Sequence, residues 1–96
     1  MKPLFQLGQT VMTRSVSDWI DDAFTADVRR IRVLACLQKH QCGDWGEVPA
    51  EDAAMNNAAL RDGDRIMSTY TVDGEKLWII TEASREVTTV LFPEDY

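Results

Sequence analysis

The stretch from residue 65 to residue 92 decides the fold, and it reads RIMSTYTV-DG-EKLWIITE-ASRE-VTTVLF. Three short runs rich in β-branched and aromatic residues are separated by turn residues, which is typical of an antiparallel meander. Asp73-Gly74 predicts a two-residue type I′ turn, because both central positions of that turn need positive φ. The resulting register pairs Tyr70 with Leu77, Ser68 with Ile79, Met67 with Ile80 and Arg65 with Glu82.

Alternation along the three strands predicts two sheet faces that are both apolar in the middle. The first face comprises Ile66, Ser68, Tyr70, Val72, Leu77, Ile79, Thr81, Thr88, Val90 and Phe92. The second comprises Arg65, Met67, Thr69, Trp78, Ile80, Glu82, Val87, Thr89 and Leu91. A half-solvated sheet would show one clearly polar face. We therefore expect both faces to be covered, by helices, by the N-terminal segment or by another subunit.

The residues before the meander predict a short edge strand at 9–13 and then helices of roughly eight, sixteen and thirteen residues. Ser15 and Asp18 form a capping-box-like start of the first helix, and Thr25 is the predicted cap of the second. The third runs from Pro49 to Gly63. The first helix carries Val16, Trp19, Ile20 and Phe24 at helical spacing, and the second carries Val28, Ile31, Leu34, Ala35 and Leu37.

These elements predict one α+β domain over residues 1–96, with two or three N-terminal helices packed on a three- to four-stranded antiparallel meander. We expect the second and third helices to cover the first face. We expect the first helix to cover part of the second face through Trp19, Ile20 and Phe24. A two-fold homodimer that buries Trp78 would cover the rest, because large apolar patches are rare on monomers.

The charge balance sets limits on function. The chain carries 16 acidic and 10 basic residues, for a net charge of −6. This disfavours direct nucleic-acid binding, which needs a basic surface. No run approaches the ~18 apolar residues of a membrane span, and the first residues lack the apolar core of a signal peptide. We expect a cytoplasmic protein that contacts no membrane.

One group of side chains has the chemistry of a metal site but not its usual spacing. Cys36, His40, Cys42 and Asp44 lie close together in sequence. The pattern Cys-x3-His-x-Cys matches no standard zinc finger or ribbon, and no second ligand cluster follows. We predict no metal and no cofactor. The alternative role of His40 is a helix-end cation that interacts with the helix dipole.

A second group invites comparison with small ribonuclease toxins, which place polar residues on a meander packed by N-terminal helices. The candidate catalytic residues are His40, Arg65, Glu82 and Arg85. The competing interpretation is a cross-strand ion pair between Arg65 and Glu82, with threonines chosen for strand propensity. No nucleophile elbow or phosphate-binding glycine loop accompanies this group.

Candidate binding residues are Asp44, Trp45, Trp78 and Arg85. Trp45 lies in the glycine-flanked loop 43–46, where it is either a plug at the edge of the core or a ligand contact. The second helix also holds the basic residues Arg29, Arg30, Arg32 and Lys39. They are either a solvated helix face or a local contact for RNA or an acidic partner.

The chain resembles a family of small proteins carried by bacterial plasmids and integrative elements. Its members are commonly labelled "plasmid related protein" or "type I restriction endonuclease subunit M". The matching stretches are Lys2-Pro3-Leu4-Phe5, Leu7-Gly8-Gln9, His40-x-x-Gly43-Asp44-Trp45-Gly46, Glu51-Asp52, Asn57-x-Ala59-Leu60, Arg65, Ser68-x-Tyr70, Trp78-Ile79-Ile80-Thr81-Glu82-Ala83, and Thr88-Thr89-Val90-Leu91 through Pro93-Glu94-Asp95-Tyr96. The family usually reads Ala-Asp-Arg-Ser at Ala83-Ser84-Arg85-Glu86, which leaves Arg85 as the candidate of that turn.

The second label is not literal, because 96 residues hold neither the cofactor-binding domain nor the catalytic motif of a DNA methyltransferase. The resemblance implies a mobile-element setting. We therefore expect a non-enzymatic interaction protein that counteracts or modulates a host defence protein. The alternative is a small RNase-like enzyme that uses the polar residues of the sheet.

Overall fold

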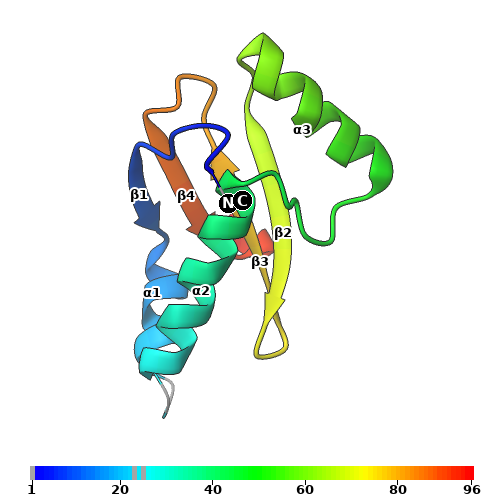
Figure 1. The fold of residues 1–96 in the computed structure, drawn as a ribbon. Coiled ribbons are helices and arrows are strands. Elements are labelled where there is room, and N and C mark those ends of the chain that lie inside the picture. Colours follow the sequence, from blue (N-terminus) through cyan, green and yellow to red (C-terminus); the bar gives the residue numbers. More distant parts are fainter. Residues whose placement is uncertain (1, 23, 25) are drawn as a thin grey trace.

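A computed structural model describes residues 2–22, 24 and 26–96, and within them it shows an α+β fold of three α-helices and one four-stranded sheet (Figure 1). In chain order the elements are β1 (Gln9–Met12), α1 (Arg14–Asp21), α2 (Ala26–Gln41), α3 (Ala50–Asp62), β2 (Ile66–Val72), β3 (Glu75–Thr81), β4 (Val87–Leu91) and the 3-10 turn η1 (Pro93–Asp95). The helices contain 8, 16 and 13 residues, which confirms the predicted lengths.

The sheet has the strand order β1-β4-β3-β2. Strands β2, β3 and β4 form the predicted antiparallel meander, whereas β1 pairs with β4 in parallel, so the sheet is mixed. Asp73 and Gly74 both have positive φ, at 50° and 80°, as a type I′ turn requires. Three predicted pairs, Tyr70–Leu77, Ser68–Ile79 and Met67–Ile80, are confirmed.

The fourth predicted pair lies just beyond the ladder. The last pair between β2 and β3 is Ile66–Thr81. Arg65 and Glu82 are the next residues beyond this pair, on the side away from the Asp73-Gly74 turn. Among the described residues no ion pair joins these two side chains. Arg65 instead donates a hydrogen bond to the Tyr96 hydroxyl at 3.0 Å.

The first face of the sheet is buried along its whole length, as predicted. Both α1 and α2 pack on it, and their buried side chains join those of the three meander strands in one core cluster. The inward face of α2, however, differs from the predicted stripe. Its buried residues are Val33, Cys36, Leu37 and His40, whereas Val28, Ile31 and Leu34 are exposed.

The second face of the sheet carries no α1 residue, and the expectation that α1 would cover it is wrong. Trp19 instead packs edge-on against Phe92 of the first face, with ring centroids 5.5 Å apart. Phe24, which follows the end of α1, is fully exposed. On the second face Tyr96 contacts the ring of Trp78 at 5.5 Å, while Ile80 is buried.

Helix α3 lies beside the outer edge of β2, next to the loop that follows α2 (Figure 1). Asn56 of α3 donates to the carbonyl of Met67 and accepts from its amide, and thus satisfies edge groups as a neighbouring strand would. The loop adds an isolated parallel bridge between Gly46 and Thr69. The edge of β2 is therefore covered.

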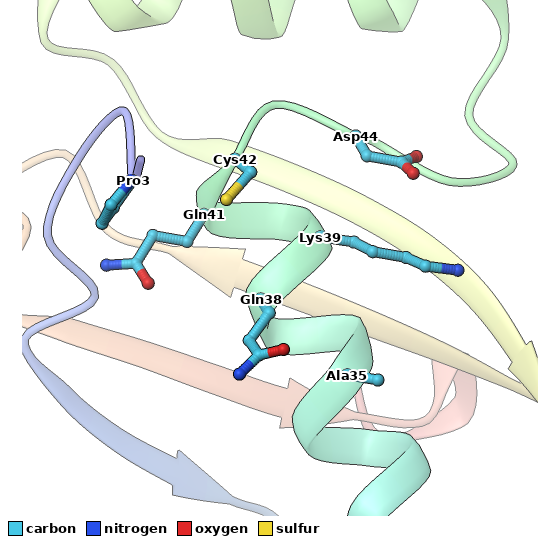
Figure 2. A pocket seen from close by; sticks show the side chains of 7 residues that line it. All are labelled: Pro3, Ala35, Gln38, Lys39, Gln41, Cys42 and Asp44. Atoms are coloured by element: carbon cyan, nitrogen blue, oxygen red, sulfur yellow. The ribbon is translucent and has the colours of Figure 1, made fainter. Parts of the chain in front are cut away.

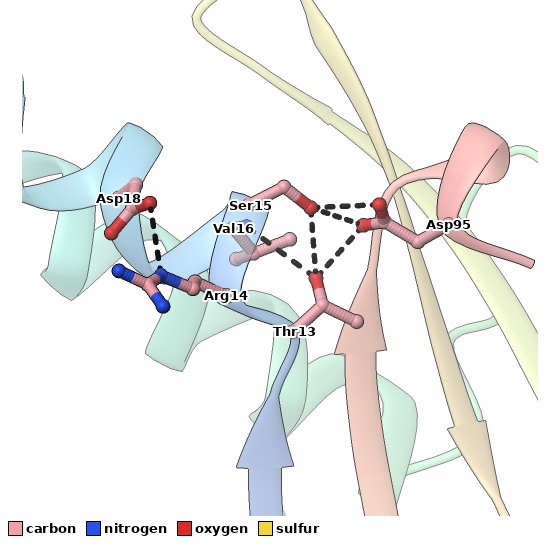
Figure 3. Close-up of polar contacts among 6 residues, drawn as sticks. All are labelled: Thr13, Arg14, Ser15, Val16, Asp18 and Asp95. Carbon is pink, nitrogen blue, oxygen red and sulfur yellow. Dashed lines mark hydrogen bonds and ion pairs between the residues drawn. The ribbon is translucent and has the colours of Figure 1, made fainter.

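The start of α1 is tied to the C-terminus (Figure 3). Thr13 caps the helix by accepting from the Val16 amide at 3.4 Å, so the predicted cap at Ser15 is wrong. The Ser15 hydroxyl instead donates to Asp95, as does that of Thr13. These hydrogen bonds hold the pKa of the Asp95 carboxyl below its usual range. The predicted cap of α2 at Thr25 lies outside the described residues.

Candidate interaction surface

His40 is fully buried between α2 and the first face of the sheet. Its Nε2 lies 2.9 Å from Thr81 Oγ1, which lies 2.7 Å from Thr88 Oγ1, and Thr88 donates to the Leu7 carbonyl at 2.7 Å. Its Nδ1 contacts the hydroxyl of Ser68. The carbonyl at the end of this chain accepts only, so each threonine hydroxyl donates toward it and His40 carries its proton on Nε2.

This environment keeps His40 neutral. Burial, together with the nearby positive charge of Arg85, lowers the pKa of His40 from 6.5 to about 4. Because both ring nitrogens are engaged and the side chain is inaccessible, the imidazole is a core group. The predicted interaction of a cationic His40 with the helix dipole is wrong, since the charged form is disfavoured here.

The ring nitrogens of His40 bond to Ser68 and Thr81 and to none of the other candidate catalytic residues. Arg65 and Glu82 are exposed at the end of the second face. Arg85 lies in the β3–β4 turn with φ of 63° and donates to the backbone carbonyls of Ala59, Asp64 and Glu82 at 3.1, 2.7 and 3.1 Å. The structure does not bring the four side chains together in one cleft.

Trp45 is 6% exposed and plugs the space between the loop and the core. Its Nε1 donates to Asn57 Oδ1 at 3.0 Å, and its ring packs against those of Phe5 and His40. The side chain therefore offers almost no surface to a ligand. Asp44 is exposed, but its carboxylate accepts from the Gly46 amide at 3.1 Å and so shapes the turn.

Burial raises the pKa of the Cys36 thiol, which makes it inert. Among the described residues no group of three His, Cys, Asp or Glu side chains is arranged to hold a metal ion.

Trp78 is half-buried beneath Tyr96 of the same chain. The patch that motivated a dimer through Trp78 is thus partly covered, and that dimer stays a prediction.

The outer side of α2, whose apolar residues the sequence pattern placed in the core, is exposed. Val28, Ile31 and Leu34 are 46%, 65% and 54% exposed, and Ala35 beside them is also exposed. We call these four residues the outer stripe. At 100° per residue they lie on one side of the helix, opposite Val33 and His40. Apolar residues on both sides of a helix are typical of a helix that is covered on both sides.

Basic residues border the outer stripe. Arg30 pairs with Asp21 at 2.8 Å and with Asp27 at 3.2 Å. Arg32 pairs with Asp73 of the β2–β3 turn, as does Arg29. These contacts lower the pKa of the Asp73 carboxyl. Lys39, in the last turn of α2, is exposed.

The outer stripe leads into a hollow at the C-terminal end of α2 (Figure 2). It measures about 570 Å³ and is open to solvent. Its lining consists of Pro3, Ala35, Gln38, Lys39, Gln41, Cys42 and Asp44. Ala35 belongs to both features, so the hollow and the outer stripe form one continuous surface.

Comparison with known proteins adds no further assignment: no family model, no curated protein and no solved structure matches the chain. In the described part of the chain, no helix combines the length and the apolar character needed to cross a bilayer.

Proposed function

We propose that this protein is a non-enzymatic interaction protein that binds a protein partner through the outer stripe of α2. The observation that carries the proposal is the exposure of Val28, Ile31 and Leu34, at 46%, 65% and 54%, on three successive turns of one helix. Contiguous exposed apolar surface of this kind marks binding sites on soluble proteins. None of these three belongs to the core cluster, whose α2 members are Val33, Cys36 and Leu37.

The arrangement of the polar residues supports a binding role over a catalytic one. General acid–base catalysis needs groups within hydrogen-bond reach of one substrate. His40 is fully buried, whereas Arg65 and Glu82 are exposed on the other side of the sheet. The guanidinium of Arg85 donates its hydrogen bonds to backbone carbonyls. The ribonuclease-like alternative therefore lacks a shared cleft.

The resemblance to proteins of plasmids and integrative elements supplies the setting for this proposal. In that setting the partner class is a host defence protein, whose activity the bound protein would counteract or modulate. The net charge of −6 supports a protein partner over nucleic acid.

Affinity capture from a native host lysate tests the proposal with three tagged forms of the chain. The wild type and Met55→Gln should retain the same protein in stoichiometric amount, because Met55, although more exposed at 69% than Ile31 or Leu34, lies on α3. The double variant Ile31→Gln/Leu34→Gln should lose it while unfolding at the same denaturant concentration. Equal retention by all three forms, or retention by none, would contradict the proposal.

A further inference from the structure

Strand β1 forms one edge of the sheet, and its outer side is uncovered (Figure 1). All of its residues are exposed, and in the described part of the chain no element lies beyond it in the strand order. Helix α1 follows directly, but it packs on the first face through Val16 and Ile20. The opposite edge differs, because Asn56 and the loop 43–46 cover β2. The sheet thus has one covered edge and one open edge.

The pairing of β1 with β4 shows which backbone groups of β1 face outward. The amides of Gln9 and Thr13 donate to the carbonyls of Glu86 and Val90, at 2.8 and 3.0 Å. In this parallel ladder, alternate residues direct both their N–H and their C=O to the neighbouring strand. The residues between them, Thr10 and Met12, therefore direct these groups outward. Outside the β1–β4 ladder, no backbone hydrogen bond among the described residues engages them.

Strand β1 lacks the features by which proteins keep an open edge from pairing, which are charged side chains, proline, bulges or a covering element. It reads Gln-Thr-Val-Met, with no charge and no proline. Its register with β4 is continuous from Gln9 to Met12, so it contains no bulge. Val11 and Met12 are 37% and 40% exposed. The strand is short, which makes any pairing weak but leaves its outward groups available.

A second copy of β1 fits this edge in an antiparallel, two-fold arrangement. In the central register Val11 lies opposite its own counterpart, and Thr10 lies opposite Met12 of the other copy. Each such Thr10–Met12 pair exchanges both of its N–H···O bonds, which satisfies the outward groups of both copies. Like charges placed directly opposite are destabilising, and this strand places none there. The edge is therefore complementary to itself.

Two-fold pairing also closes the assembly. The outer edges of the joined sheet are then the two β2 strands, which are covered, so the sheet does not grow further. The axis is perpendicular to the sheet, so the first faces of both copies lie on one side. A strand from a different protein would meet the same backbone groups, but this chain already carries a matching strand whose groups are open.

We propose that the chain forms a weak two-fold homodimer in which the two β1 strands pair and the two sheets become one continuous sheet. This dimer goes beyond the proposed function and leaves the outer stripe free, because that stripe lies on the side of α2 away from the sheet. It also differs from the dimer through Trp78, which would use the second face.

Sedimentation velocity and amide hydrogen exchange on the full-length chain test the dimer. The sedimenting mass should rise from 10.9 kDa toward twice that value between about 10 µM and about 1 mM, as expected for a small interface. Over the same range, amide exchange should slow at Thr10 and Met12, whose groups become bonded. Exchange at Val11 should change less, because its amide already faces β4.

Charge variants at position 11 identify the second strand as another copy. Val11→Lys and Val11→Glu should each stay monomeric over this range, because two like charges would meet at the two-fold axis. An equimolar mixture of the two should recover the dimer mass. Thr10→Pro is a second, uncharged test, because it removes an outward amide and no hydrogen bond to β4. It should also be monomeric, whereas Met55→Gln should behave like the wild type.

Circular dichroism melts of each variant at low concentration establish that it is folded. A wild-type chain that stays at 10.9 kDa up to about 1 mM would overturn the inference. So would a dimer that Val11→Lys leaves intact, a mixture of the charge variants that stays monomeric, or a dimer that Ile31→Gln or Trp78→Ala dissociates. Protection of Thr10 and Met12 only when a protein captured from lysate is added would assign the edge to another protein's strand, against the homodimer.

Discussion

Ile31 and Val33 lie two residues apart on α2 and face opposite directions, with Ile31 65% exposed and Val33 2% exposed. Both are β-branched and apolar, so residue type alone does not say which of them packs on the sheet. The inner position of Val33 is part of the core cluster that contains Leu77, Ile79 and Val90. The outer position of Ile31 leaves a large apolar side chain with no contact inside this core.

This relationship predicts stability effects of very different size at the two positions. Ile31→Gln should change the free energy of unfolding by no more than about 0.5 kcal/mol, as surface substitutions usually do. Val33→Ala should lower it by about 2 kcal/mol, because it removes buried methyl groups and leaves a cavity. Urea denaturation followed by circular dichroism measures both. A loss at Ile31 as large as that at Val33 would show that the outer stripe is a core surface.

A second prediction concerns the pH dependence that His40 introduces. Its pKa is 6.5 when unfolded and about 4 when folded, so between these values the unfolded chain binds more protons. Stability should therefore fall as the pH drops from 6.5 toward 4, by up to about 3 kcal/mol from this group.

His40→Gln isolates this contribution from that of the carboxylates, because glutamine does not titrate. The stability advantage of the wild type over the variant should be greatest at pH 7 and should shrink steadily down to pH 4. Denaturant titrations at four pH values test it. An advantage that is constant across this range would mean that His40 does not change its protonation on unfolding.

The extent of agreement between sequence and structure differs from one element to another. The β2–β3 register was predictable because side chains alternate with period two and Asp73-Gly74 sets the turn. The cap of α1 was not, because the carboxylate that takes the Ser15 hydroxyl comes from Asp95, 80 residues later. Such a partner is a product of tertiary structure and leaves no local signal.

The candidate site shows the same limit. The burial of His40 depends on hydroxyl groups of Ser68, Thr81 and Thr88 that the folded sheet brings together. Their spacing in the sequence equally suits strand propensity. The outer stripe of α2 was visible as apolar residues at helical spacing, but the choice between core and surface required the sheet.

Trp45 gives a third prediction. Trp45→Ala should lower the free energy of unfolding by ~3–5 kcal/mol, as truncation of a buried aromatic does. Trp78→Ala is the matched control and should cost less, because Trp78 is only partly buried. Thermal denaturation followed by circular dichroism compares them. A Trp45→Ala form that melts like the wild type would make the loop a contact site instead of a plug.

A fourth prediction follows from Arg85, whose guanidinium donates hydrogen bonds to the carbonyls of Ala59 and Asp64 and can accept none. Arg85→Ala should leave these carbonyls without that donor and loosen the last turn of α3. Hydrogen exchange at the amides of that turn should accelerate, whereas exchange in α2 should not change. Uniform acceleration across both helices would indicate global destabilisation and no local role.

The central claim is that the outer stripe of α2 is the surface that a protein partner covers. Site-specific photo-crosslinking inside the native host tests this most directly, with the crosslinking side chain placed at position 31 and, as the control, at position 55. The account predicts a covalent adduct between the chain and one other protein from position 31 and none from position 55. No adduct from position 31, or the same adduct from both positions, would contradict it.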